Sequence, residues 1–166
     1  MDTRYKEQWA RLKRWYLRLE ENRAGSKAPP DRQLDDLYAF FLNCYHFKDW
    51  LIESRPQLKV KIEALYDSTK GNDPLKIAAD IANSLKHVKA THNPRFNTPA
   101  SVVGQNVRIN LEGPVRFGQR NQLIPVSTQY SWAIQFGGKV LDAYIIAGFC
   151  IDRLKEFSRG QELELE

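Results

Sequence analysis

Large apolar residues recur at steps of three and four along the first segment of the chain, which is the spacing of one helical face. They run from Arg4 to about Asn22 and are Tyr5, Trp9, Leu12, Tyr16 and Leu19. The sequence GSKAPP follows, and its glycine and two prolines cannot continue a helix. The pattern therefore predicts an amphipathic first helix that ends near Asn22.

The next segment, DRQLDDLYAFFLNCYHFKDWLIES, is apolar around most of its helical circumference. We expect Asp31 to be its N-cap. The positions that stay polar form one narrow stripe: Asp35, Asn43, His46, Asp49 and Glu53. A helix with so little polar surface is expected at the centre of the core.

Two more helices are predicted before residue 95. The stretch Ser54 to Gln57 has the form of a capping box, so a short helix is expected to begin there and to stop near Lys70-Gly71. Asp73 and Pro74 then supply the N-cap and first-turn proline of a third long helix. We expect that helix to reach about His92, because an Asn-Pro pair follows it.

After residue 94 the apolar positions no longer recur with the helical period but alternate with a period of two, and Gly, Pro, Asn and Gln become frequent. Apolar residues alternate at two sets of positions: Val107, Ile109 and Leu111, then Tyr130, Trp132, Ile134 and Phe136. This alternation predicts a β-hairpin or a small antiparallel meander. We interpret Gly137-Gly138-Lys139 as the turn from the last strand into a final helix that starts at Val140 and ends near Gly160.

This order of elements predicts a mainly α, single-domain protein: a four-helix bundle with the β insertion before its last helix. We place the first three long helices and the short helix in 1–95, the insertion in 96–138, the last helix in 139–160 and an acidic tail in 161–166. A content of 42% apolar residues is enough to bury a sizeable core.

Composition excludes several classes of function. No apolar run approaches the roughly 18 residues of a membrane span, and the start of the chain lacks a signal peptide, so we expect a cytoplasmic protein.

Cys44 and Cys150 lie within apolar helical patterns, which predicts free thiols. With three histidines and no CxxC or HExxH spacing, we expect neither a metal site nor a cofactor. Nucleophile-elbow and glycine-rich phosphate-binding motifs are also absent from the sequence.

Positive charge is concentrated near the start of the chain. Residues 1–30 hold eight Lys or Arg against four Asp or Glu, in a chain of net charge +5. On the first predicted helix, Arg11, Arg14 and Arg18 lie away from the apolar face, and we expect them to bind the phosphate backbone of a nucleic acid. The alternative is an ordinary solvated face of a surface helix.

The third long helix carries the residues best suited to chemistry, in the stretch IAADIANSLKHVKA. On a helical wheel Asp80, Asn83 and His87 form one stripe beside the core face, with Lys86 on the outward side. Histidine can act as a general acid or base that a neighbouring Asp or Asn orients, and lysine can stabilise charge on a phosphate. Alternatively, these cations only interact favourably with the C-terminal end of the helix dipole.

The polar stripe of the second helix can extend this candidate site. His46 and Asp49 are three residues apart, so they share one helical face. If the second and third long helices pack side by side, we expect this pair to join Asp80, Asn83 and His87 as binding residues.

Three segments together resemble a known family. FFLNCYHFKDWL and IANSLKH are followed, after the predicted hairpin, by GGKVLDAYIIAGFCIDRLKEF. The combination covers Asp31 to Ser158 and resembles the HEPN-like (higher eukaryotes and prokaryotes nucleotide-binding) helical bundles of prokaryotic phage-defence and toxin–antitoxin systems. The resemblance implies a homodimer with a polar cleft beside the third long helix, and RNA, a nucleotide or a protein encoded nearby as the partner.

Active members of that family cut RNA without a metal, using an arginine placed a few residues before a histidine. None of His46, His87 and His92 has an arginine at that separation, so only His87 carries over as the catalytic or phosphate-contacting residue. Three interpretations follow: a binding module that is not an enzyme, a ribonuclease that uses His87 with Asn83, Lys86 and Asp80 or Asp49, and a purely structural interaction domain. The missing arginine favours the first.

Overall fold

The computed structural model describes residues 3–26, 28–67, 73–86, 100–111 and 126–165, and within them the protein is mainly helical with a small antiparallel sheet. The elements in chain order are α1 (Arg4–Arg23), α2 (Pro30–Ser54), the 3₁₀ helix η1 (Pro56–Leu58), α3 (Lys59–Tyr66), α4 (Pro74–Lys86), β1 (Ser101–Leu111), β2 (Val126–Phe136), β3 (Lys139–Asp142) and α5 (Ala143–Gly160). No described helix is both long enough and apolar enough to cross a lipid bilayer.

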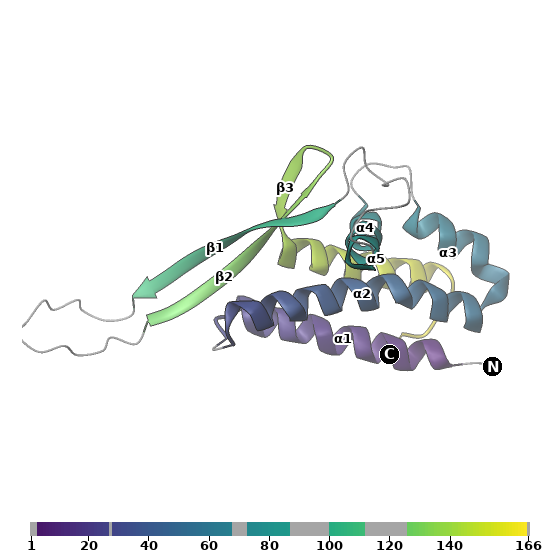
Figure 1. Ribbon diagram of the computed structural model, residues 1–166. Helices are drawn as coiled ribbons and strands as arrows, with labels where there is room; N and C mark the ends of the chain where they lie inside the picture. The colour runs from purple at the N-terminus through teal and green to yellow at the C-terminus, as the bar shows by residue number, and fades with distance from the viewer. Residues whose placement is uncertain (1–2, 27, 68–72, 87–99, 112–125, 166) are drawn as a thin grey trace, which may run out of the picture.

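Helix α2 lies at the centre of the helical part, as its sequence predicted, because it packs against α1, α3, α4 and α5 (Figure 1). Its inward side chains are fully buried: Leu37, Phe40, Phe41, Cys44, Phe47 and Leu51. Aromatic rings join it to α1, where Trp9 lies 5.6 Å from Phe47 and Tyr16 lies 6.0 Å from Phe40 between ring centroids. Burial of these large rings supplies much of the hydrophobic stabilisation of the bundle.

Two predicted helix starts are wrong in detail. Pro29, not Asp31, is the N-cap of α2, and the helix begins at Pro30. A proline suits this position because the first helical N–H has no intrahelical partner. The predicted capping box at Ser54 does not form: α2 continues through Ser54, and η1 then leads into α3 without a side-chain cap.

The start of α4 is as predicted. The Asp73 carboxylate accepts a hydrogen bond of 3.0 Å from the Leu75 N–H, which satisfies one of the free donors of the first turn. Helix α3 ends at Tyr66, before the predicted stop at Lys70-Gly71, and that stop lies outside the described residues. The predicted continuation of α4 toward His92 lies outside them as well.

The three strands pair in the order β1-β2-β3, and both pairs are antiparallel. Gly137 and Gly138, with φ of 47° and 76°, form a two-residue turn between β2 and β3. The predicted meander is therefore confirmed, but the prediction that Val140 starts the last helix is wrong. Helix α5 starts after Asp142, whose carboxylate caps it by accepting bonds from the N–H groups of Tyr144 and Ile145.

β1 and β2 form a long ribbon that projects from the helical bundle (Figure 1). The base of the ribbon packs against the helices through the buried side chains of Trp132, Ile134 and Phe136. These residues belong to the period-two pattern that predicted the strand. The pattern thus identifies the residues that anchor the ribbon to the bundle.

The residues after α5 fold back over the bundle. Glu162 adopts a positive φ of 53°, and the Leu163 N–H donates a bond of 2.9 Å to the Ser158 carbonyl. The chain then runs toward α1, where Leu163 and Leu165 are buried. We call Gln161 to Leu165 the C-terminal tail. Its alternating leucines and glutamates place apolar side chains inward and acidic side chains outward.

Both cysteines are free and buried, which confirms the prediction of unpaired thiols. Burial raises the pKa of the Cys150 thiol well above its usual value, and the neighbouring Cys44 adds to this shift. The Cys150 thiol also lies 3.3 Å from the Pro74 carbonyl, so it links α5 to the start of α4. These thiols act as small apolar residues of the core.

Candidate functional site

One residue of the polar stripe of α4, Asp80, lies deeper than its helical wheel placed it. Asp80 is only 4% exposed, although we expected it beside the core. The neighbouring alanines explain the difference, because Ala78, Ala79 and Ala82 are small enough for α2, α3, α5 and β1 to pack around the helix. Asn83 is half-buried, and Leu85 is 42% exposed.

The described part of α4 holds only some of the candidate catalytic residues. Lys86 is its last residue, and the side chain of Lys86 lies outside the described residues. All of His87 lies outside them too, so the hypothesis of catalysis by His87, Asn83 and Lys86 stays a prediction.

His46 and Asp49 form an exposed pair on α2, with His46 Nδ1 lying 3.4 Å from Asp49 Oδ2. The ring of His46 also lies against Tyr45, at 5.8 Å between centroids. Helices α2 and α4 pack together, as we assumed for the combined site. However, Asp80 is buried whereas His46 and Asp49 face solvent, so these three residues do not present one surface to a ligand.

The three predicted phosphate-binding residues of α1 are all exposed, and one of them is held in place. The Arg18 guanidinium donates to the Asp36 carboxylate of α2 at 3.2 Å and lies 4.9 Å from the centre of the Trp15 ring. Asp36 is buried and accepts a second bond, of 3.1 Å, from the Asn22 amide. Arg18 therefore has a fixed carboxylate on one side and an aromatic face on another.

A polar cavity of about 400 Å³ opens beside Arg18. Residues of α1, α2 and the turn between them line it: Arg18, Glu21, Asn22, Ser26, Ala28, Pro29, Arg32 and Asp36. The sequence did not single out Arg32. It lies on a different helix, before the first apolar residue of that helix, and is 14 residues from Arg18. We call Arg11, Arg14, Arg18 and Arg32 the basic edge of the bundle.

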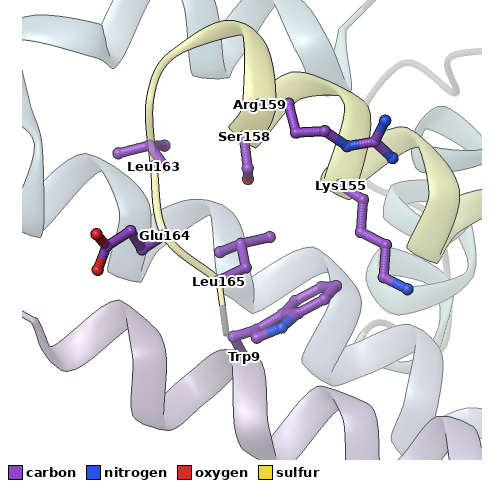
Figure 2. A pocket seen from close by; sticks show the side chains of 7 residues that line it. All are labelled: Trp9, Lys155, Ser158, Arg159, Leu163, Glu164 and Leu165. Carbon is purple, nitrogen blue, oxygen red and sulfur yellow. The ribbon is translucent and has the colours of Figure 1, made fainter.

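A second cavity, of about 450 Å³, lies between α1, the last turns of α5 and the C-terminal tail (Figure 2). It is lined by Trp9, Lys155, Ser158, Arg159, Leu163, Glu164 and Leu165. None of these residues was predicted to form a site. The alternation of leucine and glutamate at the end of the chain was the only available signal, and it does not reveal that the tail folds back onto α1.

One ion pair holds the tail beside this cavity. Lys6 Nζ lies 2.8 Å from Glu164 Oε2, and this contact raises the pKa of Lys6 and lowers the pKa of Glu164. Lys61 of α3 also donates a bond of 2.9 Å to the Gln161 side chain. Both contacts are at the surface, so they orient the tail while its buried leucines supply most of the stabilisation.

Among the residues that the structure describes, no three His, Cys, Asp or Glu side chains come together in an arrangement that could hold a metal ion. No family model, curated protein or solved structure matches the chain.

Proposed function

We propose that this protein is a HEPN-like helical module that binds single-stranded RNA along its basic edge and does not cleave it. One observation carries the proposal: Arg18 and Arg32, from two different helices, line the same polar cavity. Arg11 and Arg14 continue the exposed charge along α1. A phosphodiester chain is the ligand class that a row of separated guanidinium groups fits best.

The fixed position of Arg18 supports a binding role. An arginine side chain has five N–H donors, and its bond to Asp36 leaves others to donate to a phosphate. Because Asp36 and Trp15 already hold the side chain, little conformational entropy is lost when a ligand binds. Ser26 adds a hydroxyl to the cavity lining.

The acidic residues near the edge set the expected strength of binding. Asp36 is compensated by Arg18, and Glu21 also lines the cavity and repels a phosphate, so the cavity lining itself carries no net charge. The excess positive charge of the basic edge comes from Arg11 and Arg14. We therefore expect moderate affinity with a strong dependence on salt.

Binding is favoured over cleavage for two reasons. The sequence lacks the arginine that precedes the catalytic histidine in active HEPN-like ribonucleases. In addition, the Asp80 carboxylate was expected to orient His87 at the surface, but Asp80 is buried.

The test is fluorescence anisotropy of a labelled single-stranded RNA 20-mer over a series of salt concentrations. We expect the double variant Arg18→Gln/Arg32→Gln to weaken binding about tenfold or more, since each lost phosphate contact removes a charge-assisted hydrogen bond. The slope of log affinity against log salt concentration should become shallower by about 1.4, because each of the two lost phosphate contacts accounts for roughly 0.7 on a single strand. Glu21→Gln should strengthen binding.

Lys59→Gln is the matched control, because it removes one exposed positive charge on α3, away from the basic edge. Equal affinity of the double variant and the wild type would refute the proposal. RNA should also remain intact after incubation with the protein and a chelator; cleavage that disappears in His87→Ala would instead support the ribonuclease.

A further inference from the structure

The cavity beneath the C-terminal tail contains two buried polar groups that have no hydrogen-bond partner among the described residues. These are the Trp9 indole N–H and the Ser158 hydroxyl, on side chains that are 1% and 3% exposed. In native proteins almost every buried donor is paired. An indole N–H can only donate, and a serine hydroxyl can donate as well. The Ser158 hydroxyl, on the same helix as Lys155 and Arg159, could therefore be satisfied by a ligand that accepts hydrogen bonds.

The charge around this cavity favours a negative ligand. Lys155 and Arg159 are one turn apart on α5, so both extend from the same side of the helix (Figure 2). Neither forms an ion pair with another residue in the described ranges. Glu164, the one acid in the lining, is compensated by Lys6 and points away from Lys155. The lining thus has an excess of positive charge.

The remaining walls of the cavity are apolar. They are formed by the Trp9 ring and by Leu163 and Leu165 of the tail, and Figure 2 shows the Ser158 hydroxyl pointing toward Leu165. A small inorganic anion would leave these walls in contact with water. A ligand with an anionic head and an apolar body would satisfy the Ser158 hydroxyl and cover the apolar walls together.

We propose that this cavity binds an amphipathic organic carboxylate, with its carboxylate near Lys155, Ser158 and Arg159 and its apolar body between Trp9 and the tail leucines. The Ser158 hydroxyl and the two cations match a carboxylate group, and the volume of about 450 Å³ accommodates a short acyl chain or an aromatic acid. The site is separate from the basic edge, so the proposal does not depend on RNA binding.

The test is isothermal titration calorimetry of the full chain with octanoate, and with 1-octanol and octylamine as probes of the same length. We expect octanoate to bind at least tenfold more tightly than either, because only octanoate pairs with the two cations. Arg159→Gln and Lys155→Gln should each weaken octanoate binding about tenfold, which is the usual effect of losing a charge-assisted bond. Ser158→Ala should weaken it by a smaller factor.

Lys59→Gln is again the control and should bind octanoate like the wild type. The proposal is overturned if octanoate does not bind, if octylamine or octanol binds equally well, or if Arg159→Gln and Lys155→Gln leave the affinity unchanged. Tighter binding of inorganic phosphate than of octanoate would overturn the apolar part of the assignment. The double variant Arg18→Gln/Arg32→Gln should keep octanoate binding whether or not it loses RNA binding, so failure of one proposal is distinguishable from failure of the other.

Discussion

At the scale of the residue, Tyr144 shows how burial changes an ionisable group. Its side chain lies in the core near the start of α5. Burial raises the pKa of Tyr144 to about 12, and the nearby carboxylates of Asp142 and Asp36 add to the shift. Because the folded state disfavours the tyrosinate, it binds the hydroxyl proton more tightly than the unfolded state does.

The pKa of Tyr144 predicts how stability depends on alkaline pH. Below about pH 10, the usual tyrosine pKa, the hydroxyl is protonated in both states and its contribution to stability is constant. Between pH 10 and about 12 the unfolded state loses this proton first, so the free energy of unfolding should fall. Urea denaturation from pH 8 to 11.5 should give a shallower fall for Tyr144→Phe than for the wild type. Parallel curves for the two proteins above pH 10 would contradict this assignment.

At the scale of the element, the β1–β2 ribbon combines an anchored base with a projecting outer part. Trp132, Ile134 and Phe136 are buried at the base, where β2 contacts α1 and α5. The outer part extends beyond the helices (Figure 1). An isolated two-stranded ribbon contributes little stability of its own. The bundle should therefore fold without that outer part.

Shortening the ribbon tests this separation. Replacing residues 106–131 by Asn-Gly would join Gln105 to Trp132, which already face each other across the two strands, by a turn suited to a hairpin. We expect the melting temperature to stay within about 5 °C of the wild type, since no described core residue is lost. Trp132→Ala should instead cost about 3 kcal/mol, because it leaves a cavity at the base. A shortened protein that fails to fold would show that the outer ribbon is part of the folding unit.

In the assembled fold, the exposed face of α5 is the place where we expect a second copy of the chain. Ile145 and Phe149 are one turn apart and are 41% and 54% exposed, an unusual exposure for two large apolar side chains on one face. The homodimer expected from the sequence stays a prediction, and we place its interface on this face of α5.

Light scattering coupled to size exclusion tests the dimer. We expect a mass of twice 19.3 kDa for the wild type and of a single chain for Phe149→Asp, since a buried unpaired carboxylate at the interface would be costly. Val60→Asp on α3 replaces another exposed apolar residue, and it should leave the mass unchanged. A monomeric wild type would refute the predicted dimer. A dimeric Phe149→Asp variant would show that the interface lies on another face.

The sequence alone determined the features that depend on local spacing. The helical period predicted α1 and the central position of α2, the period of two predicted the strands, and Asp73 identified the start of α4. These predictions hold because side-chain spacing and capping act within a few residues of the chain. The same local rules misplaced the start of α5, since Gly137-Gly138 can lead into either a strand or a helix.

Which side chains meet depends on how the elements pack in three dimensions. This packing buried Asp80 because small alanines allow neighbouring helices to approach α4 from several sides, and it brought Arg32 beside Arg18 through the pairing of α1 and α2. It also placed Ser158 and the tail leucines around Trp9, more than 140 residues earlier in the chain. A periodic pattern specifies which face of an element is apolar, but the packing partners and the depth of burial depend on the shapes of all the elements together.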